Sequence, residues 1–440
     1  METRKHIYRF LFGLMASLIV GACLDELDIE TLGDEDYKGM LVIESVLSNE
    51  MKTQMVYLSR SDVRLDLETD TIYSPYLPLG NRPLDSVNME EGATIRLLAS
   101  NGTEFTFAEG QKGRYFSNEP FALQMGVDYT LEITTNTGTE YASDPIRVEG
   151  TSEVTNVYAE KAVSETGVEG VAIYVDSDPQ EGTSEYYRYT YEETYKIVAP
   201  YWSPSDFVLS NYDPCGLPFP TYTLQVLPRE TENRVCYNTV ASNSISQLST
   251  VGNPSGQVSK NMVRFIGKDN FIISHRYSIL VKQQVQSAEA YSFYETLKSF
   301  SQSEDIFSQV QPGAIYANVH RKDGTNENVL GYVEAVGASE RRLFFDYEDF
   351  FPGEELPPYP FDCSFQTSTE SHPSYCAPGP NPCPLSVIER VNNGLITFFS
   401  EYDEALVPLA SCPGPFVFVA RICGDCTLLG ENVQPDFWEE

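Results

Sequence analysis

The sequence contains little tryptophan, histidine or positive charge, and these shortages exclude several classes of protein. It has 2 Trp and 4 His in 440 residues, and its 29 Lys and Arg stand against 64 Asp and Glu, a formal net charge of −35. A surface this acidic repels the phosphate backbone of nucleic acids, which excludes a nucleic-acid-binding protein. After residue 22, no apolar run reaches the roughly 20 residues that a membrane-spanning helix needs.

Motifs that usually carry catalysis are also absent. The sequence has no HExxH, no GxSxG and no phosphate-binding loop, and its histidines are scattered. Cys423 and Cys426 form a CxxC motif, but the redox form of this motif opens a helix in a βαβ unit. Here a strand-like apolar run, residues 416–422, precedes it and a polar tail follows. We therefore expect structural disulfide cysteines, no enzymatic activity and no cofactor.

What the sequence does have is an N-terminus with the layout of a lipoprotein export signal. A positively charged start precedes the apolar run 10–20, and Val20-Gly21-Ala22 is a small-residue cleavage site directly before Cys23. An ordinary signal peptide cut near Ala22 is the alternative. We predict a signal peptide over residues 1–22, lipidation of Cys23 with palmitate and further acyl chains, and an acidic tether over residues 23–36. Several acyl chains on one residue would anchor the protein firmly to a membrane.

The start of this tether bears on which membrane face the protein occupies. Residues 24–30, Leu-Asp-Glu-Leu-Asp-Ile-Glu, resemble the acidic signal that Bacteroidetes lipoproteins use for display on the outer face of the outer membrane. A merely solvated tether is the alternative. We expect a lipid-anchored outer-membrane protein that faces the cell exterior.

Cysteine number and composition indicate a folded, exported chain. Aromatic residues at 12% and hydrophobic residues at 41% are too abundant for a disordered protein. Of 9 cysteines, Cys23 is assigned to lipid, which leaves 9 − 1 = 8. An even number in an oxidising compartment predicts four disulfides. The eight are Cys215, Cys236, Cys363, Cys376, Cys383, Cys412, Cys423 and Cys426. Cys215 and Cys236 stand apart from the others and are expected to pair with each other, while the other six staple the Pro-rich part, residues 356–426.

Short alternating runs separated by turn residues predict an all-β fold. Asn101-Gly102, between two such runs, is the strongest short hairpin signal, and Tyr129 lies where a tyrosine corner would lie in an immunoglobulin-like sandwich. We expect an immunoglobulin-like β-sandwich over residues 37–150. A larger β-rich domain would follow over residues 151–440, with a disulfide-stapled C-terminal region. Within it, the helical spacing over 287–301 predicts a short inserted helix capped by Ser287.

Several aromatic residues are candidates for ligand contact. Tyr187, Tyr189 and Tyr191 alternate along one predicted strand and share a face, either as a sugar-binding platform or as core packing, which β-sheets favour. Tyr201 and Trp202, beside prolines on a predicted loop, are the better candidates for an exposed contact.

An acidic stretch matches a calcium loop in part. Asp176, Asp178 and Glu181 offer hard oxygen ligands next to Gly182, but Pro179 interrupts the usual loop pattern. Acidic turns are also common in a chain this negative. We therefore predict no metal site and keep these three residues as the one calcium candidate.

The long polar stretch 61–91 offers two sites for modification. Thr71 and Ser86 each lie in an Asp-Ser/Thr-aliphatic triplet that resembles the O-glycosylation signal of exported Bacteroidetes proteins. An unmodified loop used for partner contact is the alternative. We expect a glycan on Thr71 or Ser86 in the native host.

A family resemblance emerges from the order of several weak motifs. These are the lipidation signal, Tyr-Glu-Thr-Leu-Lys on the predicted helix, residues 311–319 and 329–335, Cys423-Gly424-Asp425-Cys426, and the ending at 435–438. In this order they resemble the Bacteroidetes surface lipoproteins grouped as domain of unknown function 4249. The resemblance implies an accessory or cargo-binding subunit of a TonB-dependent β-barrel transporter, and no established enzymatic activity. A free-standing surface protein that binds a glycan, peptide or other ligand is the alternative.

Overall fold

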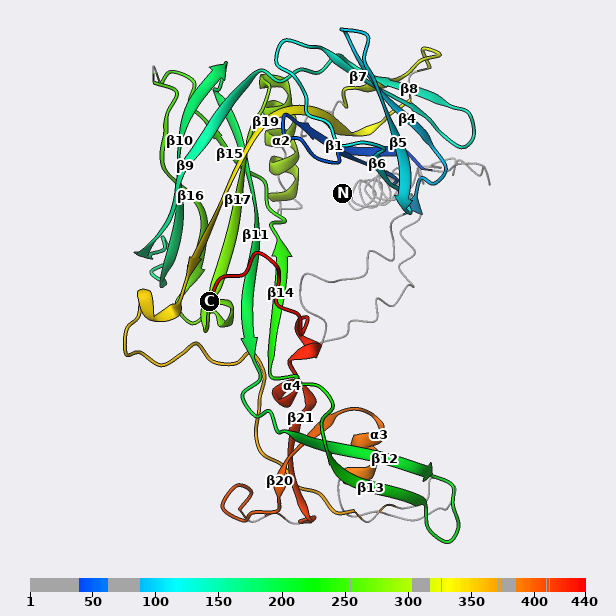
Figure 1. Cartoon of the computed structure of the whole chain (residues 1–440), viewed down its shortest axis with the longest axis vertical. Coiled ribbons are helices and arrows are strands. Elements are labelled where there is room, and N and C mark those ends of the chain that lie inside the picture. The colour runs from blue at the N-terminus through cyan, green and yellow to red at the C-terminus, as the bar shows by residue number, and fades with distance from the viewer. Residues whose placement is uncertain are drawn as a thin grey trace, which may run out of the picture.

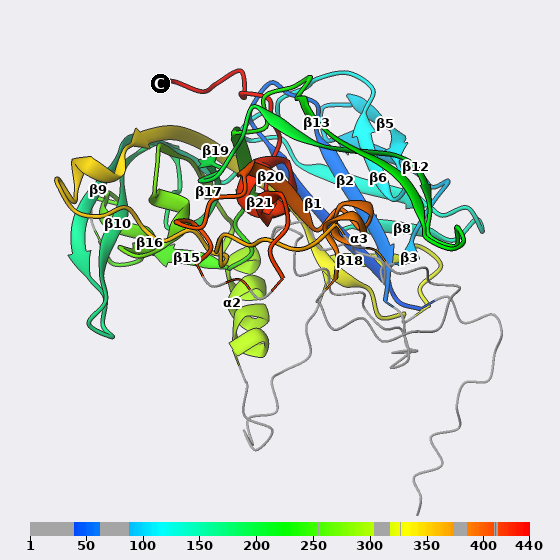
Figure 2. The same cartoon turned by 90° about the horizontal axis from the view of Figure 1, so that it is seen from below.

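The computed structural model describes residues 39–61, 88–253, 255–302, 317–325, 327–370, 372, 385–408, 410 and 412–440. It is mostly β, with 49% strand and 9% helix. Two β-rich modules, which we call the N-terminal module and the middle module, lie side by side at one end of the molecule (Figure 1). A smaller part, the distal lobe, extends from the middle module to the opposite end. Seen from below, β9, β10 and β16 lie on one side and β5 and β6 on the other, with β20 and β21 between them (Figure 2).

The N-terminal module is a curled sheet. Its strands are β1 (Leu41–Ser48), β2 (Met55–Arg60), β3 (Asn88–Met89), β4 (Thr94–Ala99), β5 (Glu104–Gln111), β6 (Arg114–Ser117), β7 (Tyr129–Thr134), β8 (Glu140–Ser143) and β18 (Val319–Arg321). Starting from β19 (Leu330–Phe345), their order is β19-β1-β2-β6-β5-β4-β7-β8-β18, and β3 pairs with β2. Neighbours are antiparallel except β1 and β19, which are parallel.

The two ends of this run of strands meet through one buried side chain. Asn318, directly before β18, donates from Nδ2 to the carbonyl of Val333 at 2.8 Å and accepts from the N–H of Val333 at 2.9 Å. A side-chain amide thus takes the place of a strand neighbour for β19. The curl encloses apolar residues from alternating strand positions, among them Ile43, Leu97 and Leu131, none of which is exposed.

The middle module consists of two facing sheets. One contains β14 (Val235–Ala241), β11 (Tyr186–Val198), β17 (Tyr277–Val285) and the second half of β19, with β15 (Ser246–Ser249) on the edge of β11. The other contains β16 (Val258–Gly267), β10 (Glu169–Gly182) and β9 (Gly150–Val163). Apolar side chains from both sheets form the core between them. The helix α2 (Ala288–Gln302) and two 3₁₀ turns, η1 (Phe271–Ile273) and η2 (Tyr347–Asp349), complete the module.

The distal lobe is assembled from two separate stretches of chain. The hairpin β12 (Ser205–Asp213) and β13 (Thr221–Pro228) is inserted between β11 and β14, while α3 (Val387–Asn392), β20 (Ile396–Glu401) and β21 (Phe416–Ala420) follow the middle module. Their apolar side chains share one small core. The short helix α4 (Arg421–Gly424) and the turn η3 (Cys426–Leu428) lie where the lobe joins the middle module, a junction that we call the neck.

Three local predictions are confirmed. The inserted helix spans Ala288–Gln302, and the Ser287 hydroxyl accepts from the N–H of Ala290 at 3.1 Å as an N-cap. The hairpin turns at Gly102, whose φ of 89° is one that glycine adopts without strain. Tyr187 and Tyr189 are buried in the core of the middle module, so the core interpretation of this run is correct.

The finer description of the fold stays a prediction. The Tyr129 hydroxyl accepts from the N–H of Gln124 at 2.8 Å, a contact to the backbone a few residues upstream such as a tyrosine corner makes. The strands around it, however, belong to one curled sheet, and an immunoglobulin-like sandwich is not shown. The division of the chain near residue 150 also stays a prediction. The two modules also share the strand β19, whose first half pairs with β1 of the N-terminal module and whose second half pairs with β17 of the middle module.

Candidate functional site

A polar cleft lies where the N-terminal module meets the middle module. It has a volume of about 240 Å³. One wall comes from the end of β1 and the residues just after it, and the other from β11, β17 and β19. The lining residues are Val46, Ser48, Glu50, Lys52, Thr190, Lys282, Gln284, Ala338, Ser339 and Glu340. Most of those on the strands of the middle sheet are at alternate positions and therefore point to the face opposite the core.

Charges of both signs flank this cleft. The Lys52 ammonium lies 2.5 Å from a carboxylate oxygen of Glu50, and the Lys282 ammonium lies 2.5 Å from one of Glu192, the residue beside the cleft on β11. All four side chains are about a third to a half exposed. Because each ammonium is already balanced and Glu340 adds a further carboxylate to the lining, the cleft disfavours an anionic ligand and suits an uncharged polar one. Amide and hydroxyl groups of Gln284, Thr190 and Ser48 would hydrogen-bond to it.

A buried ion pair lies beside the cleft. Arg188 on β11 places its guanidinium 2.6 Å from the carboxylate of Glu334 on β19, and their side chains are 9% and 1% exposed. Arg188 Nε also donates to Gln284 at 2.8 Å, which links the ion pair to the cleft wall. Gln286 donates to the second oxygen of Glu334 at 2.7 Å. The pair therefore ties the middle sheet to the strand that leads into the N-terminal module.

The helix α2 covers this ion pair. The ring of Tyr294 lies 4.1 Å from the guanidinium carbon of Arg188. Burial alone would lower the pKa of Arg188, but the charge of Glu334 and the contact with Tyr294 raise it, and the net shift is upward. Burial and the nearby Glu334 also raise the pKa of Tyr294. At neutral pH Arg188 is thus charged and Tyr294 is neutral. Arg188 can therefore form both the ion pair with Glu334 and the cation–π contact with the Tyr294 ring.

Two disulfides hold the neck, and they correct the predicted connectivity. Cys236 at the start of β14 bonds Cys426, not Cys215, and Cys363 bonds Cys423. The prediction had paired Cys215 with Cys236 because they are neighbours in the sequence, but Cys215 lies at the far end of the hairpin β12–β13. Cys215 and Cys412 are disulfide-bonded as well. Cys376 and Cys383 lie outside the described residues.

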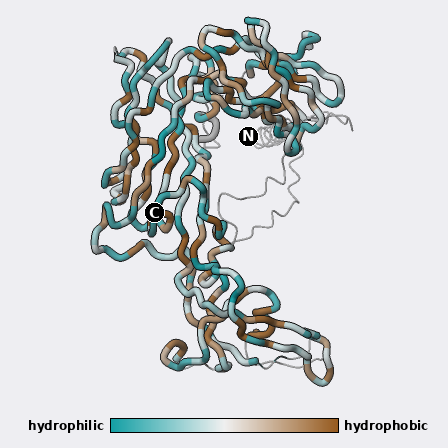
Figure 3. Tube along the Cα trace, viewed as in Figure 1, coloured by the Kyte–Doolittle hydropathy of each residue, from teal (hydrophilic) through white to brown (hydrophobic). Residues whose placement is uncertain are grey.

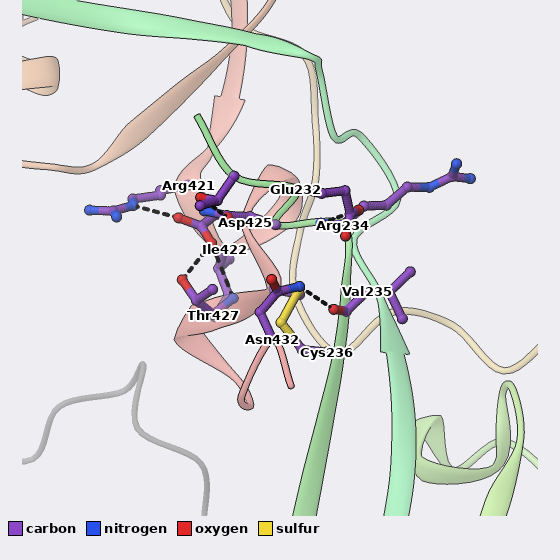
Figure 4. Close-up of a disulfide and its surroundings, with 12 residues drawn as sticks. Glu232, Arg234, Val235, Cys236, Arg421, Ile422, Asp425, Thr427 and Asn432 are labelled. Carbon is purple, nitrogen blue, oxygen red and sulfur yellow. Dashed lines mark hydrogen bonds and ion pairs between the residues drawn. A yellow bond between two sulfur atoms is a disulfide. The ribbon is translucent and has the colours of Figure 1, made fainter. Parts of the chain in front are cut away.

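The cysteines of the CxxC motif, Cys423 and Cys426, form structural disulfides in the neck, as predicted. They bond distant partners across chain separations of 60 and 190 residues. Figure 4 shows the surroundings of one of these bonds, where Asp425 accepts from the N–H of Thr427 at 3.1 Å and from Arg421 at 3.2 Å. Asn432 donates to the carbonyl of Val235 at 2.6 Å beside the disulfide (Figure 4). The Asp425 contacts fix the local shape of the neck, while the Cys236–Cys426 disulfide and the Asn432 hydrogen bond join it to β14 of the middle sheet.

Tyr201 and Trp202, the predicted exposed contacts, are half-buried in the neck. The ring of Tyr201 packs against Phe365 and Phe399, with centroids 4.7 and 5.8 Å apart. Trp202 packs on the edge of the same apolar cluster. Their position next to prolines correctly indicated an irregular segment. It did not reveal that residues 361–365, far along the chain, cover this segment.

The calcium candidate lies on a strand and not on a loop, which corrects that expectation. Asp176, Asp178 and Glu181 all belong to β10. Asp176 accepts from the backbone N–H of Lys260 at 2.7 Å, and Asp178 accepts from the side chain of Gln257 at 2.8 Å. Across the described parts of the chain, no group of three or more His, Cys, Asp or Glu side chains could hold a metal ion.

The remaining predicted sites lie outside the described residues. They are Cys23 with the acidic tether, and the candidate glycosylation sites Thr71 and Ser86. No local sequence pattern indicates the cleft itself. Its lining residues come from four strands that are far apart in the chain, and only the alternation of polar residues along 188–192 and 282–286 could have indicated a polar outer face.

These features describe a mostly β protein with a polar cleft between its N-terminal and middle modules and a distal lobe that is joined through a disulfide-bonded neck. The chain belongs to the family described as Domain of unknown function (DUF4249), whose model matches residues 25–342. No curated protein matches the chain. Among the helices that the structure describes, none is long and apolar enough to span a membrane.

Proposed function

We propose that the protein is an outer-membrane surface lipoprotein that serves as an accessory or cargo-binding subunit of a TonB-dependent transporter. The observation that carries the proposal is the combination of an export signal ending at Cys23 with membership of this family. The acidic residues after Cys23 support a position on the outer face.

The anchor would hold the N-terminal module near the membrane. From Cys23 to Gly39, where the described chain begins, there are 39 − 23 = 16 residues. An extended chain of this length spans at most about 55 Å. The N-terminal module, in our proposal an immunoglobulin-like adapter, would then lie closest to the lipid. The distal lobe, at the opposite end of the molecule (Figure 1), would reach away from the anchor toward a partner.

The cleft supports a role in binding cargo. The buried Arg188–Glu334 pair beside it holds Gln284 of the wall through a hydrogen bond, so this part of the wall is pre-organised before a ligand arrives. Its wall polarity fits a ligand rich in hydroxyl or amide groups, such as a sugar or a peptide. A transporter subunit would use such a cleft to hold its cargo weakly enough for release.

The proposal is tested in the native host in two steps. Labelling with a palmitate analogue should mark the wild-type protein and not Cys23→Ser, and protease added to intact cells should cleave it. Affinity purification from membranes in mild detergent should then recover a large β-barrel transporter with the wild-type protein. Recovery of an unlabelled, protease-protected protein without a transporter would refute the proposal.

The same cleft favours a second function, that of a free-standing glycan- or ligand-binding surface protein. A glycan array probed with the soluble chain should then give binding that Lys282→Ala weakens about tenfold, as expected for loss of one charged hydrogen bond of roughly 1.5 kcal/mol. Gln284→Ala should weaken it about fivefold, as expected for loss of a neutral hydrogen bond of roughly 1 kcal/mol. Lys322→Ala is the matched control, because Lys322 is similarly exposed and paired with Glu132, but on the N-terminal module. An array without binding would argue against this function.

A further inference from the structure

The loop at the end of the hairpin β12–β13 presents two apolar side chains to solvent. Leu217 is 72% exposed and Phe219 is 73% exposed, among the highest values for large apolar residues in the described chain. We call these two residues the apolar tip. They lie in the part of the distal lobe farthest from the two upper modules (Figure 1), and Figure 3 shows hydrophobic colour in this loop.

The loop that carries the apolar tip is held in one shape. Gly216 lies so close to the following turn that a Cβ there would be 2.8 Å from the carbonyl oxygen of Phe219. The N–H of Cys215 donates to the side chain of Asp213 at 2.9 Å, and Cys215 is disulfide-bonded. Prolines at 214, 218 and 220 fix three more φ angles. A partner would therefore find both side chains already in place, with little conformational entropy left to lose.

The distal lobe has an apolar core of its own, and the apolar tip is not part of it. The hairpin already buries one face: Phe207, Leu209 and Leu224 pack against the cluster around Val387, Ile388 and Phe418. Leu217 and Phe219 lie beyond that cluster. Solvent-exposed side chains of this size on an ordered loop are typical of the anchors that fill a pocket in a partner.

Charge decides between a membrane and a protein as the partner. No Lys or Arg occurs between Lys196 and Arg229, and the hairpin carries the acidic residues Asp206 and Asp213. Segments that bind lipid surfaces are rich in Lys and Arg because lipid headgroups are anionic. The acidic neighbour Asp213 instead complements basic side chains around a protein pocket.

We propose that the apolar tip is the docking point for a protein partner, whose surface offers an apolar socket bordered by basic side chains. Phe219 is the central anchor, with Leu217 beside it. That this partner is the transporter rests on the function proposed above. The tip would then join the complex at the end of the molecule opposite the lipid anchor.

The experiment places a benzophenone-bearing phenylalanine analogue at position 219 of the full chain in its native host. Illumination should crosslink it to one protein, which mass spectrometry identifies, and Leu217→Asp in the same chain should abolish the crosslink. The analogue at position 51 is the control, because Met51 is 73% exposed on the N-terminal module and should give no such product. With the identified partner purified, Phe219→Asp should weaken binding about tenfold or more. Circular dichroism should show that it folds like the wild type.

The outcomes separate this proposal from the proposed function. A crosslink to a TonB-dependent transporter supports both. A crosslink to a different protein, lost in Leu217→Asp, supports the apolar tip and overturns the transporter assignment. A crosslink to lipid or to a second copy of this chain, or no crosslink at all, overturns the tip, even where the transporter still co-purifies.

Discussion

Replacing Arg188 by methionine should destabilise the middle module more than any substitution of a surface charge. Methionine fills a similar volume but leaves the Glu334 carboxylate, whose side chain is 1% exposed, without its partner at 2.6 Å. Breaking a buried pair in this way costs about 3–5 kcal/mol, since an uncompensated charge stays in a poorly solvated site. Loss of the contact with the Tyr294 ring adds to this cost.

The two tryptophans make the measurement specific to this part of the molecule. Trp438 packs on Tyr237 and Phe344 of the middle sheet, with ring centroids 4.9 and 5.8 Å apart, and Trp202 lies in the neck. Tryptophan fluorescence during urea unfolding therefore follows the middle sheet and the neck. The double variant Arg188→Met with Glu334→Leu should recover most of the lost stability, because an apolar pair of similar volume replaces a buried ion pair at little cost.

A matched control distinguishes a buried pair from an exposed one. Lys282→Met breaks the pair with Glu192, whose two side chains are 34% and 39% exposed on the same sheet. This change should cost less than about 1 kcal/mol. A loss below about 1 kcal/mol for Arg188→Met as well, or a double variant no more stable than the single one, would show that Arg188 and Glu334 do not behave as a buried ion pair.

Four further predictions concern the rest of the fold. Cys236→Ala opens a disulfide that closes a separation of 190 residues, and denaturant unfolding followed by tryptophan fluorescence should show a loss of about 2–5 kcal/mol. Asn318→Ala leaves the buried N–H and carbonyl of Val333 without their side-chain partner, and calorimetry of the full chain should show a loss of about 2–4 kcal/mol. Burial and the hydrogen bond to Glu327 raise the pKa of Tyr141 to about 12. As the pH rises, the unfolded chain therefore loses this proton before the folded protein does, and the stability of the fold falls between about pH 10 and pH 12. Tyr141→Phe should reduce that fall in thermal melts at alkaline pH. Alkylation without reduction should modify none of the eight cysteines after Cys23, and stoichiometric labelling would contradict this prediction.

Features set by neighbouring residues could be predicted from the sequence. The helix begins where Ser287 caps it, because the capping hydroxyl and the N–H that it accepts from are three residues apart. The hairpin at Gly102 needs only a glycine at a positive φ between two alternating runs. The burial of Tyr187 and Tyr189 follows from the same alternation, since one face of a strand in a two-sheet module is core.

Features that join distant segments could not be predicted in the same way. The parallel pairing of β1 with β19 brings Val46 beside Glu334, almost 300 residues apart in the sequence. No local pattern encodes such a pairing, and the cleft, which lies between the end of β1 and the middle sheet, depends on it. The disulfide Cys236–Cys426 illustrates the same limit, because proximity in sequence favoured Cys215 as the partner of Cys236. The half-burial of Trp202 likewise depends on a stretch that arrives much later in the chain.

The most direct test of the proposed function is native mass spectrometry of the protein extracted in mild detergent from the outer membrane of its own cells. We expect a particle that contains this chain, its acyl groups at Cys23 and one β-barrel transporter. A particle with the mass of the acylated chain alone, from cells that also produce the transporter, would contradict it.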